Sequence, residues 1–146
     1  MKVEMLGEVL CRLQKILDNY RKEILEEQYV RVTKILNEFQ EWQKGGGFTA
    51  DDLYMLIIYS EEDEGIFEYA ESDFLPEDEE LRCMWQVLLS ALMAVVRIAY
   101  EQEGKPCQQD VDAIKLSEVE GFYQCILDDK MDIIQLFHYF CEKVCY

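Results

Sequence analysis

The side chains with the clearest capacity for metal or nucleophilic chemistry lie near the end of the chain. The only histidine, His138, is followed by Cys141 and Cys145, a spacing that places all three on one face of a helix. Soft metal ligands could converge there, but a structural zinc site uses four ligands, usually with a tight Cys-x-x-Cys pair, and neither is present. The pattern favours ordinary core packing and leaves a helical metal-binding or enzymatic domain as the alternative.

A second concentration of reactive groups lies between residues 61 and 80, which hold eleven carboxylates and no Lys or Arg. Part of it approaches the offsets of a calcium-binding loop, but Ser60 stands where the first Asp is required, which disfavours calcium. Aromatic side chains such as Phe67 and Tyr69 are interleaved with the carboxylates. Rigid aromatic anchors beside charges suit a surface that recognises a basic protein.

We therefore predict that the main partner-binding surface lies in this stretch. The local reason is that no Lys or Arg occurs from Gly45 to Leu81, which concentrates the negative field beside the aromatic residues. The alternative is a solvated acidic surface that only keeps the protein soluble, or a generic acidic adaptor. No catalytic residue, cofactor or metal is assigned. The predicted surface comprises Glu61, Glu62, Asp63, Glu64, Phe67, Glu68, Tyr69 and Glu71.

The overall charge narrows the class of partner. The chain has 146 residues, with 31 acidic against 14 basic side chains, giving a formal net charge of −17. This balance argues against a direct nucleic-acid binder and against binding to an anionic membrane surface, since both depend on Lys and Arg. It favours a cationic protein partner. No apolar core of signal-peptide type precedes Glu8, and the six cysteines mostly occupy apolar helix positions, so we expect a cytoplasmic protein with reduced thiols.

The element that must organise these groups is a helix over Leu81–Ala99. Its apolar residues recur at three- and four-residue steps, and most of its other positions are apolar as well. Such a helix is either a core helix or a membrane span. The charge-free run from Cys83 to Val96 is too short for a span and contains Gln86 and Ser90. We predict a buried central helix over about residues 77–102, with Pro76 in its first turn and with Trp85 and Leu88 buried.

Amphipathic segments on either side predict a single all-α domain, residues 1–146, of about six or seven helices. Asp18-Asn19 and the glycines 45–47 mark breaks. Thr49-x-x-Asp52 and Ser117-x-x-Glu120 resemble capping boxes that begin helices. The expected helices span about residues 2–18, 20–44, 49–59, 77–102, 109–116, 117–128 and 130–144.

A compact, very acidic, all-α chain of this size resembles the small immunity proteins that accompany bacterial polymorphic or contact-dependent toxins. The resemblance spans the chain but lies in size, charge and helical pattern, so it transfers no functional residues. It implies tight binding to a toxin domain, often a cationic nuclease, by occlusion of the active site. Many such families are α/β, whereas this sequence shows no strand pattern.

Overall fold

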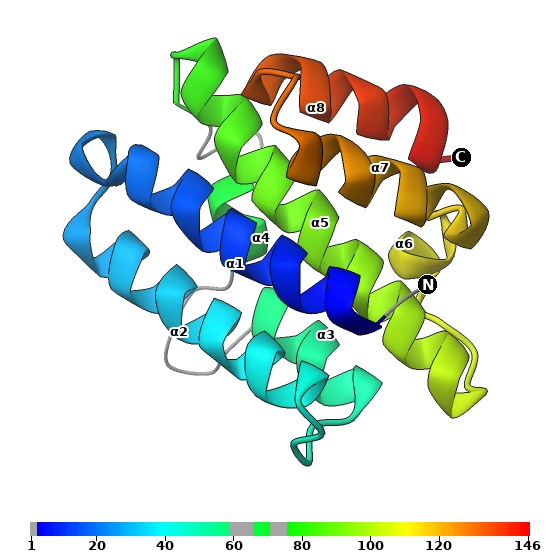
Figure 1. The fold of residues 1–146 in the computed structure, drawn as a ribbon. Helices are drawn as coiled ribbons and strands as arrows, with labels where there is room; N and C mark the ends of the chain where they lie inside the picture. The colour runs from blue at the N-terminus through cyan, green and yellow to red at the C-terminus, as the bar shows by residue number, and fades with distance from the viewer. Residues whose placement is uncertain (1–2, 59–65, 71–75) are drawn as a thin grey trace.

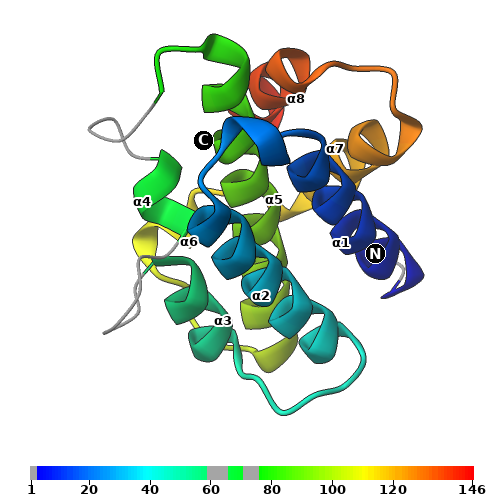
Figure 2. The same ribbon diagram turned by 90° about the vertical axis from the view of Figure 1, so that its left-hand side faces the viewer.

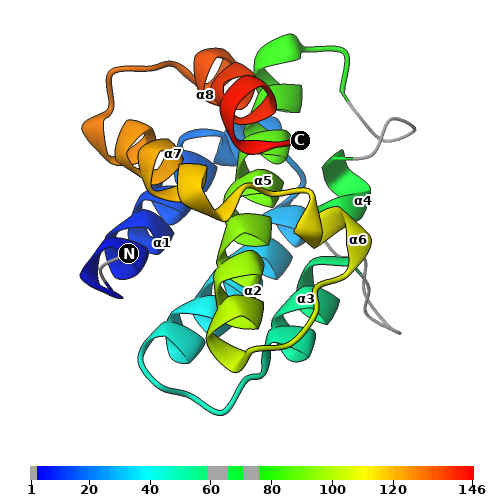
Figure 3. The same ribbon diagram turned by 90° about the vertical axis from the view of Figure 1, so that its right-hand side faces the viewer.

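A computed structural model describes residues 3–58, 66–70 and 76–146 of the chain. The prediction of an all-α fold is confirmed: the described residues form eight α-helices and no strand, apart from an isolated bridge between Ile114 and Cys145. The helices surround one long central helix, α5 (Glu79–Glu103), which packs against α1, α3, α4, α6, α7 and α8. Figure 1 shows α5 running behind α1, and Figures 1 and 3 show α8 beside its N-terminal half and α3 beside its C-terminal half.

The first two helices form an antiparallel hairpin. Helix α1 (Val3–Asn19) ends at the predicted Asp18-Asn19 break, and a 3₁₀ turn (Arg21–Glu23) leads to α2 (Glu26–Gln43), so the two are not one continuous rod. Helix α2 ends at the glycine run, where Gly45 adopts a left-handed φ of +97°. The Gly46 N–H donates to the Glu41 carbonyl and the Gly45 N–H to the Trp42 carbonyl, which satisfies the last turn. A Cβ at Gly46 would lie 2.7 Å from the Glu41 carbonyl oxygen, so only glycine fits there.

Two short helices follow on another side of α5. The predicted capping box starts α3 (Ala50–Ile58): the Thr49 N–H donates to Asp52 Oδ2 at 2.9 Å, and the Asp52 N–H donates to Thr49 Oγ1 at 3.1 Å. Helix α4 (Ile66–Ala70) is a short helix within the predicted acidic surface. Figure 2 shows α3 and α4 next to each other along α5.

The central helix is the core of the protein. Trp85 and Leu88 are 2% and 0% exposed, which confirms their predicted burial. Helix α5 is the one described helix long and apolar enough to span a membrane, but 83% of its most apolar window is buried inside the protein, as in a core helix. The prediction for Pro76 is wrong: it precedes the helix, and Asp78 is the N-cap, whose carboxylate accepts the Leu81 N–H at 2.9 Å. Gly104, at φ +69°, ends α5 close to the predicted end at about residue 102.

The C-terminal helices cover the remaining side. They are α6 (Gln109–Asp112), α7 (Leu116–Asp128) and α8 (Ile133–Tyr139), which continues into a π-helical turn (Phe140–Val144). The predicted capping box at Ser117 is wrong, because α7 already begins at Leu116. The preceding Lys115 is extended, with its N–H bound to the Val144 carbonyl at 2.7 Å. Instead, a capping box between Asp132 and Gln135 begins α8.

Candidate partner-binding surface

The charge of the chain is divided very unevenly along its length. Residues 1–44, which include the α1–α2 hairpin, contain eight basic and eight acidic side chains. Residues 82–146 contain six basic and ten acidic side chains. The 37 residues between them, Gly45 to Leu81, contain thirteen acidic side chains and no basic one, so they account for most of the net charge of −17. We call Gly45–Leu81 the basic-free segment; its described parts are α3, α4 and the start of α5.

Helix α4 carries the described members of the predicted surface. Phe67 and Glu68 are half-buried, so both keep part of their side chains at the surface. Tyr69 is only 4% exposed: its ring lies 5.1 Å from that of Trp85, and its hydroxyl oxygen accepts a hydrogen bond from Arg31 Nη1 at 2.9 Å. Tyr69 therefore fastens α4 to α5 and α2 in the free protein and does not offer its ring to a partner. Five members lie outside the described residues: Glu61, Glu62, Asp63, Glu64 and Glu71.

Tyrosine hydroxyls hold several carboxylates at the edges of the basic-free segment. Tyr100 of α5 donates to Asp51 Oδ1 at 2.5 Å, which joins the end of α5 to the start of α3. Tyr54 of α3 donates to both oxygens of Asp110, at 3.1 and 3.2 Å. A phenol that donates a hydrogen bond fixes a carboxylate without neutralising it, whereas a Lys or Arg would cancel its charge. These contacts therefore position negative charge while preserving it.

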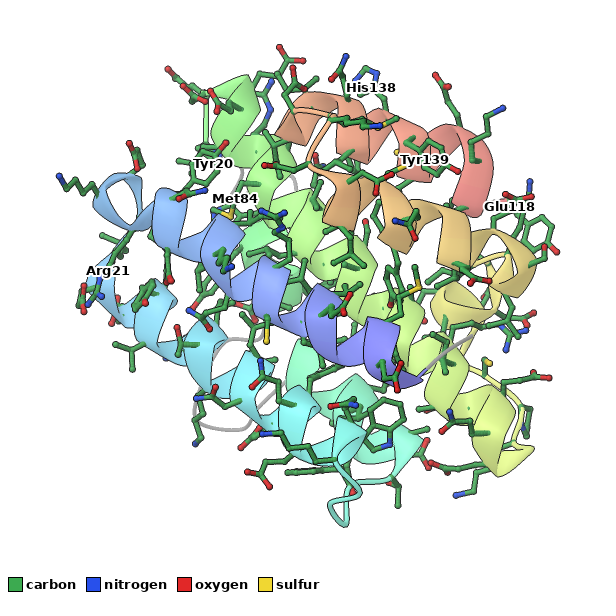
Figure 4. The ribbon with its side chains drawn as sticks, in the orientation of Figure 1. Tyr20, Arg21, Met84, Glu118, His138 and Tyr139 are labelled. Atoms are coloured by element: carbon green, nitrogen blue, oxygen red, sulfur yellow. The ribbon has the colours of Figure 1, made fainter. Side chains whose placement is uncertain are left out.

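The same arrangement occurs at the other end of α5. Tyr20 donates to Glu80 Oε1 at 2.6 Å, and Figure 4 shows Tyr20 at the end of α1, next to the start of α5. Burial, followed by the hydrogen bond to Glu80 and the charge of that carboxylate, raises the pKa of Tyr20 well above its usual range, so the phenol remains a donor. A surface depression of about 660 Å³ lies beside this contact, lined by Asn19, Tyr20, Glu23, Asp78, Glu80 and Leu81.

The alternative hypothesis of a metal-binding or enzymatic domain rests on His138, Cys141 and Cys145. These residues lie near the end of the chain, outside the basic-free segment. His138 and Cys141 are exposed and Cys145 is half-buried; Figure 4 shows His138 on the outer side of α8. Although Cys141 is exposed, partial desolvation by the surrounding protein, and then the neighbouring Cys145 and Glu142, raise the pKa of its thiol, which opposes thiolate formation. Within residues 3–58, 66–70 and 76–146, no group of three or more His, Cys, Asp or Glu side chains is arranged to hold a metal ion. All six cysteines are described, and none is in a disulfide.

The tyrosine contacts were not predicted from the sequence. Tyr100 and Asp51 are 49 residues apart, and Tyr20 and Glu80 are 60 apart. No local spacing links such pairs, because only the packing of α1 and α3 on α5 brings them together. The one available signal was the number of tyrosines, nine, in a chain with so many carboxylates.

Comparison with known proteins gives one match. A family model described as "Immunity protein Imm6" matches residues 6–128, which run from α1 to the end of α7. No curated protein and no solved structure matches the chain.

Proposed function

We propose, since the chain belongs to the Imm6 family of immunity proteins, that it neutralises a toxin domain whose docking face is basic. The family implies a toxin as partner and suggests a non-catalytic role for this chain. Our proposal adds the chemistry of the contact: the basic-free segment binds the cationic face and occludes the toxin's active site. A nuclease domain fits this description, because its substrate-binding cleft attracts phosphates through Lys and Arg.

The observation that carries the proposal is the division of charge. The basic-free segment has thirteen carboxylates and no cation of its own, whereas residues 1–44 are balanced. Complementary charge steers diffusional encounter and can raise association rates by roughly 10–10³-fold. Carboxylates spaced along α3, α4 and the start of α5 could occupy positions that phosphates take in a nuclease cleft. The fastening of Asp51 and Glu80 by tyrosines supports this proposal, because a phenol holds each carboxylate in a fixed place without adding an opposing charge.

The test uses the purified cognate toxin domain. We expect it to bind the protein at a one-to-one ratio and to lose its activity on complex formation. We further expect the association rate to fall by about tenfold or more when the salt concentration rises from 0.02 to 0.5 M, since surface charges are then screened. A toxin that binds at a salt-independent rate, or that remains active when saturated, would contradict the proposed mechanism.

A further inference from the structure

The outer face of α3 is unusually apolar for its surroundings. The inner face of this helix, Ala50, Leu53 and Ile57, is fully buried. On the outer face the Met55 side chain is 47% exposed and stands beside the half-buried Leu56. Exposed apolar side chains scattered singly are normal on protein surfaces, so exposure alone carries no conclusion. The surroundings of Met55 are what distinguish it.

Met55 lies in a depression. Gly47, Phe48, Asp52, Met55 and Leu56 line an open hollow of about 570 Å³ on the surface of α3 and the loop before it. Phe48 and Leu56 form its apolar floor, because each is partly buried against the core. Methionine is flexible and polarizable, and it adapts to the shape of an incoming side chain. The hollow is therefore suited to receive an apolar group from a partner.

One carboxylate, Asp52, lies at the rim of this hollow, and Asp51 precedes it in the sequence. Asp51 and Asp52 are exposed, and each accepts one hydrogen bond, from Tyr100 and from the Thr49 N–H respectively. An ionised carboxylate has about four acceptor positions, so both retain capacity for a cation. Lys105 follows α5, and its Nζ lies 3.5 Å from Oε1 of Glu103, whose other oxygen accepts the Ala50 N–H at 2.6 Å. This lysine is therefore already paired with a carboxylate.

We propose that this hollow anchors an apolar side chain of the toxin, next to a toxin Lys or Arg that pairs with Asp52. The proposal rests on the function proposed above and assigns the contact that holds the complex together after charge has brought the partners together. Steering acts mainly on association, whereas a buried apolar anchor acts mainly on dissociation. A second copy of this chain is a poor occupant, because it would bring a second basic-free segment toward the first and place like charges together.

The test compares Met55→Asp with a matched control, Val30→Asp. Val30 on α2 is 57% exposed and lies in the charge-balanced part of the chain. Both changes add one negative charge. If charge alone drove binding to a basic toxin, Met55→Asp would bind equally well or better. An apolar anchor predicts the opposite: Met55→Asp should weaken the Kd for the toxin domain by about 10- to 100-fold, mainly through faster dissociation. Val30→Asp should stay within about twofold of the wild type.

Further measurements distinguish failure of the apolar anchor from failure of the proposed function. Circular dichroism and thermal melting check that each variant is folded, and Met55→Leu, which keeps an apolar group, should retain wild-type affinity within about threefold. If the wild type does not bind the toxin, the proposed function fails. If the wild type binds and Met55→Asp binds as tightly, the proposed function stands and the anchor is overturned. A wild-type dimer that Met55→Asp converts to a monomer would assign the hollow to a second copy and also overturn the anchor.

Discussion

The α1–α2 hairpin and the basic-free segment belong to the same helical assembly but treat charge in opposite ways. In residues 1–44, which include the hairpin, acidic and basic side chains are balanced, and some polar groups pair within the hairpin: Asp18 accepts from Gln14 and Tyr29, and Arg21 binds Glu26 at 2.7 Å. The Arg21 guanidinium also lies 4.0 Å from the centre of the Tyr29 ring. The basic-free segment has no cation of its own, and its described carboxylates at Asp51 and Glu80 are held by tyrosine hydroxyls.

Under the proposed function, this difference would separate stability from recognition within one fold. Both regions depend on α5 for burial, through α1 on one side and through α3 and α4 on the other. The hairpin lies within residues 1–44, whose eight acidic side chains are balanced by eight basic ones, so it lacks a field of one sign that would steer a charged partner. The basic-free segment has thirteen carboxylates and no Lys or Arg of its own, which is the basis for proposing it as the docking surface. Variants in the shared core, in each region and at the contact between α5 and the basic-free segment test whether stability and recognition are separate.

The largest effect is expected from the core that both regions share. Leu88 in α5 is fully buried, and Leu88→Ala should lower the free energy of unfolding by about 2–5 kcal/mol, through lost burial and the cavity that remains. Denaturant unfolding measures this value. The control is Leu25→Ala, at a side chain 60% exposed, which should change stability by less than about 0.5 kcal/mol. Equal stability of Leu88→Ala and the wild type would contradict the burial of Leu88 in the core.

An intermediate effect is expected from reversing charge in the basic-free segment. Changing Glu61, Glu62 and Glu64 together to Lys should slow association with the toxin domain by about tenfold or more at low salt, because it removes part of the steering field. The unfolding midpoint should change far less than the association rate. Stopped-flow or surface-binding kinetics at low and high salt provide the measurement.

A charge-matched triple variant in the hairpin sharpens the comparison. Changing Glu8, Glu27 and Glu41, all exposed, to Lys alters the net charge by the same amount outside the basic-free segment. If only overall charge matters, the two triple variants will slow association equally. If the segment itself is the docking surface, the hairpin variant will retain most of the wild-type rate.

The smallest effect is expected at a junction between α5 and the basic-free segment. Burial, and then the hydrogen bond to Asp51, raise the pKa of Tyr100 well above its usual range. A raised pKa in the folded state means that this phenol stabilises the protein fully below the unfolded pKa of about 10 and that the contribution is lost as pH rises from there toward the folded pKa. Tyr100→Phe should cost about 1 kcal/mol at pH 7 and should make stability fall less steeply above pH 10.

Unfolding curves between pH 7 and pH 11.5, read by far-UV circular dichroism, check this prediction. Tyr146→Phe serves as the control because this side chain is 84% exposed and its removal also deletes one phenol. An identical alkaline slope in Tyr100→Phe and the wild type would show that the contact with Asp51 does not fasten α3 to α5.

Features that depend on near neighbours in the sequence were predictable. The apolar run of α5, the left-handed stops at Gly45 and Gly104, and the Thr49–Asp52 capping box all involve residues within a few positions of one another. The Ser117–Glu120 box has the same local form, yet α7 begins one residue earlier. Contacts between Lys115 and Val144 and between Ile114 and Cys145, about thirty residues apart, set the path of the chain there. A distant contact thus overrode a local signal.

The candidate surface was predictable in its charge and less so in its geometry. The lack of Lys and Arg from Gly45 to Leu81 can be read directly from the sequence. An aromatic side chain, however, looks the same whether it anchors a helix or faces a partner. Tyr69 does the first, which became visible only from its contacts with Trp85 and Arg31. The hollow around Met55 was missed because Leu53 to Tyr59 is apolar throughout, and the sequence does not show which side of α3 faces outward.

The position of α5 within the chain has a consequence for how the protein is made. Helices α1, α3 and α4 all precede the helix on which they pack, which ends only at Glu103. Helices α1 and α2 can pair with each other earlier, but the faces of α1, α3 and α4 that pack on α5 have no permanent partner until residue 103 of 146, about seven tenths of the chain, has been synthesised, and domains generally fold as units during synthesis. The thirteen carboxylates of the basic-free segment, which holds α3 and α4, then favour solubility of the growing chain through their net charge. Protection against a toxin would therefore begin only after α5 has emerged from the ribosome. The order of the helices along the chain sets this delay.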